Sequence, residues 1–386
     1  MARRVPGRFE QVSVGGEQVQ AFVPVPLPPK DLTLEPGLVE QVRRAEEALV
    51  RLELAGQMVP SLDWFIYAFV RKEAVLSSQI EGTQATLLDL LSHETEHEPQ
   101  PNADLEEVTN YLAALSYARS ELAKPRGLPL SMRLLNEAHR RLMRGVRGDG
   151  KQPGAVRKSQ NWIGGNRPSL AVHVPPPPHT LSGLLSDLER YFHREDELSP
   201  VMRAGLIHAQ FETIHPYLDG NGRIGRLLVA LLLEDWGVLT RPLLYLSLYF
   251  KRHQHEYYRR LNAVREGAWE PWLAFFADGV ETIANEAVDT VRDLFGRVSS
   301  DRQRLLAHPN ASLTALQLFE QLPRHPLITT AWVVEHLQTT KPTAGRAVEA
   351  LVQADILVET TGRKRDRVYA YQAYLDRLRE GTDPPF

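Results

Sequence analysis

Apolar residues recur at helical spacing along most of the chain. Between residues 201 and 214, Leu206, Ile207, Phe211 and Ile214 fall on one face of a predicted helix. The same pattern predicts further helices over residues 36–55, 62–81, 104–122, 131–142, 181–193, 227–233, 249–261 and 270–297. We therefore expect a mainly α-helical protein, with strands confined to short segments.

Two segments interrupt this pattern in the first half of the chain. Residues 1–36 are extended and rich in proline, which suits an arm packed on the domain surface. Residues 156–174 have glycines at Gly164 and Gly165 and prolines after them, and this stretch predicts a β-hairpin that stands out as a flap. An ordinary surface hairpin is the alternative, although exposed edge strands are a liability that a protein retains for a purpose.

The last part of the chain has a different composition, and the shift near residue 299 predicts a domain boundary. Between residues 328 and 371, two short helices are followed by a strand, a turn and a strand. This order resembles a winged-helix domain, with Thr343 and Arg346 on the recognition helix. The wing would carry the basic residues Arg363, Lys364, Arg365 and Arg367 near nucleic-acid phosphates. Protein docking or dimerisation is the alternative use of such a domain.

The stretch from His215 to Arg226 has the composition of a phosphate site. Pro216 disfavours helical geometry at His215, so the chain should turn there. Residues 219–222, Asp-Gly-Asn-Gly, can turn successive backbone N–H groups toward one anion. Helix resumes after them, and the positive end of its dipole favours phosphate.

The side chains of this stretch add charge and a base. Arg223 and Arg226 are three positions apart, hence on one face of the helix. Asp219 offers a hard oxygen ligand for magnesium, and His215 offers a base near neutral pH. A helix–turn–helix with surface charges is the alternative. We expect His208, on the preceding helix, to be structural.

Residues 215–226, His-Pro-Tyr-Leu-Asp-Gly-Asn-Gly-Arg-Ile-Gly-Arg, resemble the signature of the Fic family, with Tyr217 where phenylalanine is commoner. The resemblance implies an α-helical enzyme that transfers AMP from ATP to protein hydroxyl groups and releases pyrophosphate. It implies that His215 is the catalytic base and that Asp219 holds Mg2+. The implied nucleotide site consists of Glu81, His215, Gly220, Asn221, Gly222, Arg223, Ile224, Gly225, Arg226 and Tyr258.

A second resemblance to the family lies on an N-terminal helix. Residues 77–82, Ser-Ser-Gln-Ile-Glu-Gly, resemble the inhibitory motif, whose glutamate pairs with the second arginine of the signature. Here Glu81 would pair with Arg226 and obstruct the site of the ATP γ-phosphate, with Ser77 and Gly82 completing the motif. The alternative is a Glu and a Gly that merely finish a helix.

These resemblances imply an organisation for the whole chain. Residues 1–61 form an N-terminal arm and helix, residues 62–298 a Fic-like catalytic domain with its inhibitory helix at 62–82, and residues 299–386 a winged-helix domain. In the Fic family a flap like that at 156–174 holds the target segment by strand addition. The expected partners are target proteins, DNA through the C-terminal domain, and a second copy in a homodimer.

Residues 93–97, His-Glu-Thr-Glu-His, match the zinc-protease pattern His-Glu-x-x-His. That chemistry needs both histidines on one face of a stable helix, together with a third ligand. Here the pattern is polar and runs into prolines, so it predicts a solvated acidic loop and no metalloprotease.

Composition excludes further classes. The 386 residues contain no cysteine, which excludes disulfides, thiolate chemistry and zinc–cysteine sites. The net charge of -3 argues against global attraction to nucleic acid. Neither a signal peptide nor an apolar run long enough for a bilayer is evident, so we expect a cytoplasmic protein.

Other functions stay open. A Fic-like site can use another nucleotide donor, or can favour removal of AMP from a target. From a different class, the chain can be a transcription regulator whose core senses nucleotide, although the presence of both His215 and Asp219 argues against this. A toxin is disfavoured because Glu81 would supply a built-in restraint.

Overall fold

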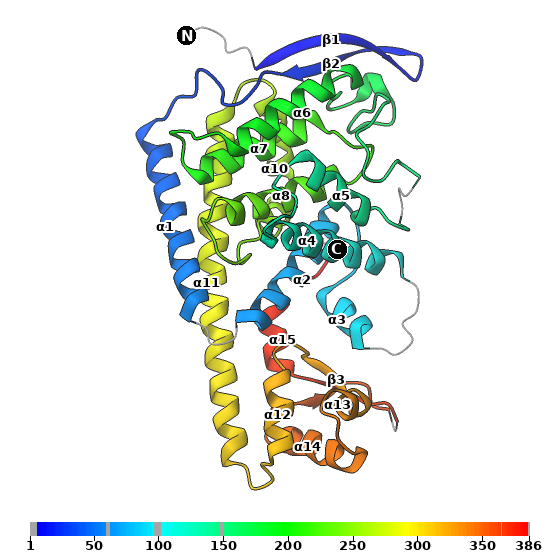
Figure 1. Cartoon of the computed structure of the whole chain (residues 1–386), viewed down its shortest axis with the longest axis vertical. Coiled ribbons are helices and arrows are strands. Elements are labelled where there is room, and N and C mark those ends of the chain that lie inside the picture. Colours follow the sequence, from blue (N-terminus) through cyan, green and yellow to red (C-terminus); the bar gives the residue numbers. More distant parts are fainter. Residues whose placement is uncertain (1–5, 59–61, 96–101, 147–149, 364, 385–386) are drawn as a thin grey trace.

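Helices dominate the structure, a computed structural model that describes residues 6–58, 62–95, 102–146, 150–363 and 365–384. The helices of the main body are α1 (Pro36–Met58), α2 (Leu62–Ile80), α3 (Leu87–Thr95), α4 (Ala103–Ala123), α5 (Met132–Leu142), α6 (Pro178–His193), α7 (Pro200–Ile214), α8 (Asn221–Asp235), α9 (Ser247–Arg252), α10 (Gln254–Val264) and α11 (Trp269–Ala307), as Figure 1 shows. The expected mainly α-helical class is therefore confirmed. One predicted helix, over 249–261, is divided at His253 into α9 and α10.

Helix α3 corrects the prediction of a loop around His93. The helix is anchored by buried Leu87, Leu90 and Leu91 and continues through His93 and Glu94. Glu94 also accepts hydrogen bonds from Tyr67 and Arg71 of α2, which hold it against the protein. The second histidine of the zinc pattern, His97, lies outside the described residues.

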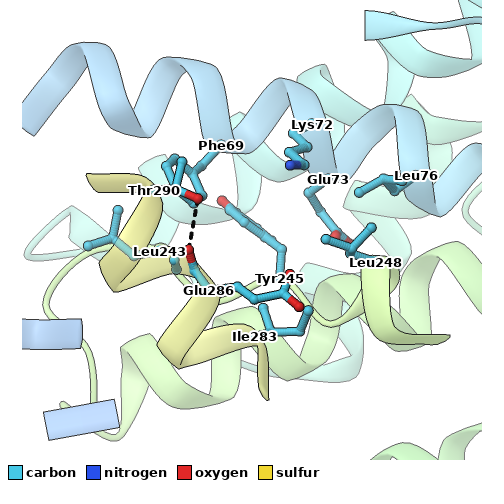
Figure 2. Close-up of a pocket in the computed structure, with 11 residues that line it drawn as sticks. Phe69, Lys72, Glu73, Leu76, Leu243, Tyr245, Leu248, Ile283, Glu286 and Thr290 are labelled. Carbon is cyan, nitrogen blue, oxygen red and sulfur yellow. Dashed lines mark hydrogen bonds between the residues drawn. The ribbon is translucent and has the colours of Figure 1, made fainter. Parts of the chain in front are cut away.

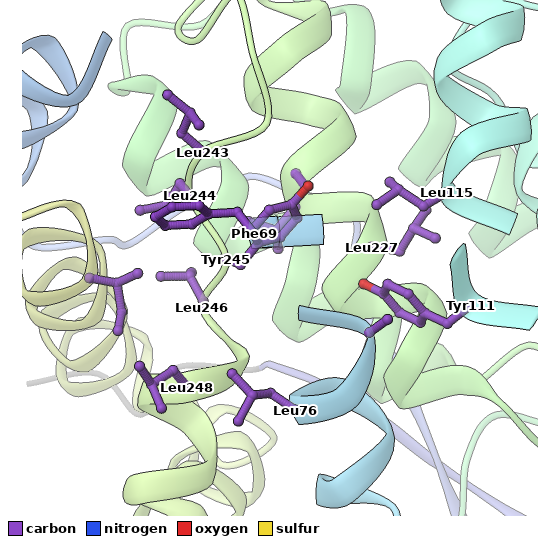
Figure 3. Close-up of a cluster of buried hydrophobic side chains, with 14 of the residues drawn as sticks. Phe69, Leu76, Tyr111, Leu115, Leu227, Leu243, Leu244, Tyr245, Leu246 and Leu248 are labelled. Carbon is purple, nitrogen blue, oxygen red and sulfur yellow. The ribbon is translucent and has the colours of Figure 1, made fainter. Parts of the chain in front are cut away.

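Helix α2 runs through the centre of the body. Its Phe69 and Leu76 line a cavity of about 40 Å³ together with Tyr245 (Figure 2). The same side chains belong to the main apolar cluster, where α2 meets Tyr111 of α4 and Leu227 of α8 (Figure 3). The long helix α11 supports this body, and α1 packs along it (Figure 1). This shared core fixes α2 next to α8.

The N-terminal arm is a β-hairpin, which the sequence pattern does not predict. Strands β1 (Gly7–Val14) and β2 (Glu17–Pro24) pair in antiparallel register from Gly7–Pro24 to Val14–Glu17. The turn consists of Gly15 and Gly16, both with positive φ, which suits glycine. The hairpin contacts the flap through a backbone hydrogen bond that Phe22 N donates to Val174 O (2.9 Å).

The flap, residues 156–174, folds back on itself as predicted but contains little regular strand. Its two sides meet in one antiparallel bridge between Ile163 and His173, and a 3-10 helix, η1 (Pro168–Leu170), occupies the tip. Gly164 and Gly165, both with positive φ, turn the chain directly after Ile163, so the pairing does not continue toward the tip. The root is held instead by Arg157, whose guanidinium donates to Pro176 O (2.6 Å).

The C-terminal region follows the predicted order of elements. It contains α12 (Leu313–Gln321), β3 (Leu327–Thr329), α13 (Thr330–His336), α14 (Lys341–Gln353), β4 (Val358–Glu359), β5 (Val368–Ala370) and α15 (Gln372–Leu378), with the antiparallel strand order β3-β5-β4. The winged-helix assignment itself stays a prediction. Helix α11 continues through the predicted boundary at residue 299 to Ala307, so the domain division also stays a prediction. Of the basic wing residues, Lys364 lies outside the described residues.

In the described residues, no helix is both long and apolar enough to cross a membrane.

The C-terminal region is joined to α11 by one buried and one exposed polar contact, among others. Tyr371 donates to Asp301 Oδ2 of α11 (2.7 Å), and Arg377 of α15 pairs with Asp293 (3.1 Å). Helix α15 then leads the chain back toward α2 (Figure 1).

Candidate active site

The chain turns sharply between α7 and α8, as predicted from Pro216. His215 ends α7 with φ 50° and ψ 63°, a left-handed conformation that is uncommon outside glycine. The turn is held by Arg157 of the flap root, whose Nε donates to His215 O (2.9 Å) and whose backbone N donates to Pro216 O (2.9 Å). The flap and the turn are therefore one unit.

Asn221 closes the turn from inside. Tyr217 N donates to Asn221 Oδ1 (2.8 Å), and Asn221 Nδ2 donates to Tyr217 O (2.9 Å). The sequence predicts that this amide contacts phosphate, but in the structure it is buried and engaged with the backbone, where an unpaired amide would be costly. Gly220, with φ 75°, precedes α8, whose first N–H groups have no acceptor within the helix. The backbone of Gly220 and Gly222 is thus left as the predicted anion site.

His139 of α5, which is not among the residues predicted from the sequence, holds the other side of the turn. Its Nε2–H donates to Asp219 O (2.9 Å), and its Nδ1 accepts from Gly154 N (2.8 Å). Its ring stacks on that of Tyr217, with 3.9 Å between the ring centroids. Burial lowers the pKa of His139 to about 4, so the ring is neutral. A histidine on the buried face of a predicted amphipathic helix is the signal that points to it.

His215 presents a neutral imidazole at the turn. Burial, followed by the charges of Arg157 and Arg265, lowers its pKa to about 3. Its Nδ1 is buried and has no hydrogen-bond partner within the described part of the chain. A bound polyanion would raise this pKa, since a nearby negative charge favours the imidazolium form. The ring can therefore accept a proton when an anion is present.

Asp219 carries the carboxylate predicted to bind magnesium. Its Oδ2 lies 2.9 Å from Lys151 Nζ, and its Oδ1 accepts from Gly220 N (2.7 Å). Burial alone would raise the pKa of Asp219, but these contacts hold the pKa below its usual value. Among the described residues, no three His, Cys, Asp or Glu side chains are grouped so that they could hold a metal ion. Mg2+ commonly takes one or two carboxylates and completes its shell with water and phosphate oxygens, so Asp219 fits such an ion.

Arg223 is buried and paired. Its Nη1 donates to Glu107 Oε2 of α4 (2.9 Å), and the two side chains are only 4% and 5% exposed. Its Nη2 lies 3.9 Å from Asp219 Oδ1. Glu107 is not among the residues predicted from the sequence, and its place on the buried face of an amphipathic helix is the signal that points to it. Arg223 is thus oriented by α4 toward the turn.

Arg226 donates three hydrogen bonds to acceptors at the end of α2. Its Nε donates to Ser77 Oγ (2.9 Å), and its Nη2 donates to Ser77 O (2.8 Å) and to Glu81 Oε1 (2.7 Å). The predicted contact between Glu81 and Arg226 is therefore present. Gly82, with φ +104°, turns the chain away after α2. A Cβ at Gly222 would lie 2.2 Å from Glu81 Oε1, so glycine there lets the carboxylate reach the start of α8.

The remaining predicted residues of α8 have packing roles. Ile224 is fully buried in the apolar core, so its side chain faces away from any nucleotide. Gly225 admits Glu212 of α7, since a Cβ would lie 2.4 Å from Glu212 Oε1. Burial raises the pKa of Glu212 to about 7. Glu212 is thus a buried carboxylate near Arg226 that is not predicted from the sequence.

Tyr257 and Tyr258 of α10 have different environments. Tyr257 is buried, and its hydroxyl bonds with His208 Nε2 (2.8 Å), which confirms that His208 is structural. Tyr258 is 43% exposed, and burial of its hydroxyl, followed by the charge of Glu81, raises its pKa to about 12. The structure thus brings Tyr258 close to Glu81.

Comparisons with known proteins agree with this geometry. Residues 39–120 match the family model described as Fic/DOC family N-terminal, and residues 129–233 match that described as Fic/DOC family. The proteins named protein adenylyltransferase Fic from Culex quinquefasciatus and Aedes aegypti are each 33% identical over 177 residues, which cover 45% of this chain and 32% of each relative. The match therefore spans about a third of those relatives.

Solved structures show the same fold. A Fic family protein from Desulfovibrio desulfuricans G20 matches with a TM-score of 0.55 and 22% identity, over 88% of this chain and 97% of that one. Fic-1 (residues 134–508) from C. elegans matches with a TM-score of 0.51 and 20% identity, over 66% and 73%. The fold is thus that of Fic proteins. By sequence, the likeness to the Fic/DOC family covers residues 39–120 and 129–233 of this chain.

The neutral state of His139 predicts a pH dependence of stability. Its pKa is about 4 in the fold against 6.5 in the unfolded chain, so unfolding takes up a proton between these values and stability falls as pH falls. Between pH 7 and pH 5 this histidine should contribute roughly 2 kcal/mol to the loss. Urea unfolding at both pH values should show a smaller loss in His139→Gln, which keeps both hydrogen bonds without titrating.

The exposed His255 provides the control for this measurement. His255→Gln should show the same pH dependence as the unsubstituted protein. Equal pH dependence in His139→Gln and the unsubstituted protein would contradict the neutral state of His139.

Proposed function

We propose that this protein is a protein adenylyltransferase, which transfers AMP from ATP to Ser, Thr or Tyr hydroxyl groups of target proteins and of itself. The observation that carries the proposal is the neutral imidazole of His215 at the turn that leads into the N-terminus of α8. Relatives named protein adenylyltransferase Fic support it, since they are 33% identical to this chain over 177 residues.

In the proposed reaction His215 accepts the proton of the acceptor hydroxyl, whose oxygen attacks the α-phosphorus of ATP. The bond from the α-phosphorus to the oxygen bridging it to the β-phosphorus breaks, pyrophosphate leaves, and AMP remains as an ester on the protein. The start of α8, Arg223 and Arg226 hold the phosphates, so catalysis depends on positioning and charge stabilisation. Mg2+, when bound, would neutralise charge on the pyrophosphate, and Asp219 is the residue that would hold it.

We further propose that Glu81 inhibits this activity. A γ-phosphate would use the guanidinium donors of Arg226 that are bonded to Ser77 and Glu81. The carboxylate of Glu81 also occupies the space beside Gly222, at the start of the anion site. ATP must therefore displace Glu81 before it can bind in a productive position.

The acceptor segment is proposed to pair with the flap. The side of the flap at Val174 is already bonded to β2 through Phe22. The opposite side, at residues 158–163, is therefore the one that an acceptor strand would use. Main-chain pairing of this kind tolerates different target sequences, with alternate side chains providing selectivity.

His215→Ala tests the proposed base. After incubation with ATP and magnesium, intact-mass analysis of the unsubstituted protein should show added AMP, and the variant should show a loss of at least about 100-fold, as for removal of a general base. Because His208 is structural and packs in the core, His208→Ala is not a suitable control; the exposed His255→Ala should retain the modification. Retained AMP in His215→Ala would exclude the proposed role, and a different added mass would identify another donor.

Glu81→Gly tests the proposed inhibition. The variant frees Arg226 for phosphate, so self-modification should rise by about tenfold or more, in the range of typical coupling free energies. Glu81→Gln keeps the shape without the charge and should give a smaller rise. An unchanged or lower rate in Glu81→Gly would mean that the contact with Arg226 is only structural.

Lys151→Met tests whether Asp219 binds the magnesium ion, in competition with the ammonium group of Lys151. The ammonium group lies where a cation would bind, so its removal should lower the magnesium concentration for half-maximal transfer by about two- to fivefold, as for a partly exposed ion pair. The exposed and remote Lys341→Met should leave it unchanged. Weaker ATP binding without magnesium would show that Lys151 contacts the nucleotide instead.

A further inference from the structure

The end of α2 is bonded to a part of the chain far from the signature. Gln79, two residues before Glu81, is buried in the last turn of this helix. Its Nε2 donates to Ala85 O and to Thr382 O, both at 2.8 Å. One side chain thus ties the last turn of α2 both to the chain that follows it and to the C-terminal segment.

Lys251 of α9 completes this junction from a third direction. Its Nζ donates to Gln79 Oε1 (2.6 Å) and also to the backbone carbonyls of Gly381 and Asp383. Thr382 between them is only 1% exposed. The amide of Gln79 therefore has partners on both its oxygen and its nitrogen, and removal of either would leave a buried polar group unpaired.

Packing and charge hold the same segment in place. Gly381 has φ +80°, and a Cβ there would lie 2.7 Å from Leu248 Cδ1. Leu248 lines the cavity beside α2 together with Lys72 and Glu73 (Figure 2). Burial lowers the pKa of Lys72 to about 8, and the charge of Glu380 partly offsets this. The C-terminal segment thus packs along the buried side of α2.

We propose that residues 381–383 act through Gln79 and Lys251 as a positioning element for Glu81. Detaching this segment releases the last turn of α2, weakens the contact between Glu81 and Arg226, and opens the nucleotide site. The inference rests on the proposed inhibitory role of Glu81. It gives Gln79 and Lys251 a positioning role, although neither residue is among those that define the signature or the inhibitory motif. It also couples the C-terminal region to the site through α15.

Linkage makes the effect reciprocal. If the segment favours the closed state, then ATP, which favours the open state, must weaken the hold on the segment by the same factor. Hydrogen exchange in peptides covering residues 379–384 should therefore become faster when ATP is bound. This readout requires no transfer of AMP.

Gly381→Val tests the proposal in the full chain. A β-branched residue at this φ is strained and meets Leu248, so it should displace the segment without changing any residue of the site. Gly362→Val is the matched control, since Gly362 has φ +63° and nothing within 4 Å of a Cβ. Both variants are made with His215→Ala, so that ATP is bound but not consumed.

The expected result is faster hydrogen exchange over residues 77–83 and at least fivefold tighter binding of ATP with magnesium in Gly381→Val, with no change in Gly362→Val. Lys251→Met should act in the same direction. Adding Glu81→Gly should remove the effect of Gly381→Val on ATP affinity, because the carboxylate through which the segment acts is then absent.

Two results would overturn the proposal. One is a released segment, seen by exchange over residues 379–384, with unchanged exchange over 77–83 and unchanged ATP affinity. The other is an equal effect of Gly381→Val with and without Glu81. If Glu81→Gly alone leaves ATP affinity unchanged, the inhibitory role of Glu81 fails, while exchange over 77–83 still reports whether the segment holds α2.

Discussion

The structure depends on a buried guanidinium, that of Arg226. Helix α8 is buried along most of its length, and a buried cation must be compensated. Ser77 and Glu81 supply that compensation, which ties α2 to α8. Glu81 is nevertheless about one-third exposed, so it is the partner that can be exchanged. What replaces it must also be an anion, since an empty place would leave the charge unpaired, and a phosphate satisfies this condition.

The other charged groups of the turn are also paired with groups of opposite charge. Arg223 is paired with Glu107 of α4, and Asp219 is paired with Lys151. Each pair joins the turn to a different element, so the site is balanced in charge before any ligand binds. A nucleotide brings negative charge and a divalent cation brings positive charge, and together they can replace Glu81 and Lys151 without leaving a buried charge alone. This balance explains why the structure can be stable without a ligand and still be compatible with the proposed binding of ATP and magnesium.

The sequence predicts the local parts of this arrangement well. Helical periodicity and Pro216 predict that α7 ends at His215, and the glycines of residues 219–222 predict the start of α8. The contact between Glu81 and Arg226 follows from family resemblance, not from spacing. His139, Glu107 and Lys151 lie 80, 116 and 68 positions from their partners, and no local pattern encodes such pairings. The N-terminal hairpin is missed for a similar reason, since its β2 is buried by the flap and by α7, which lie far along the chain.

Segments from the two terminal regions contact the two parts of the site that are proposed to bind the acceptor and to inhibit the enzyme. The hairpin β1–β2 contacts the flap at Val174, on the side opposite the one proposed to pair with an acceptor. The segment after α15 accepts a hydrogen bond from Gln79 at the end of α2, close to the proposed inhibitory residue Glu81. The turn between them is held by hydrogen bonds from Arg157, Asn221 and His139 to its backbone. In the proposed reaction, this arrangement would let acceptor binding and nucleotide access change separately, while the turn keeps its geometry around His215.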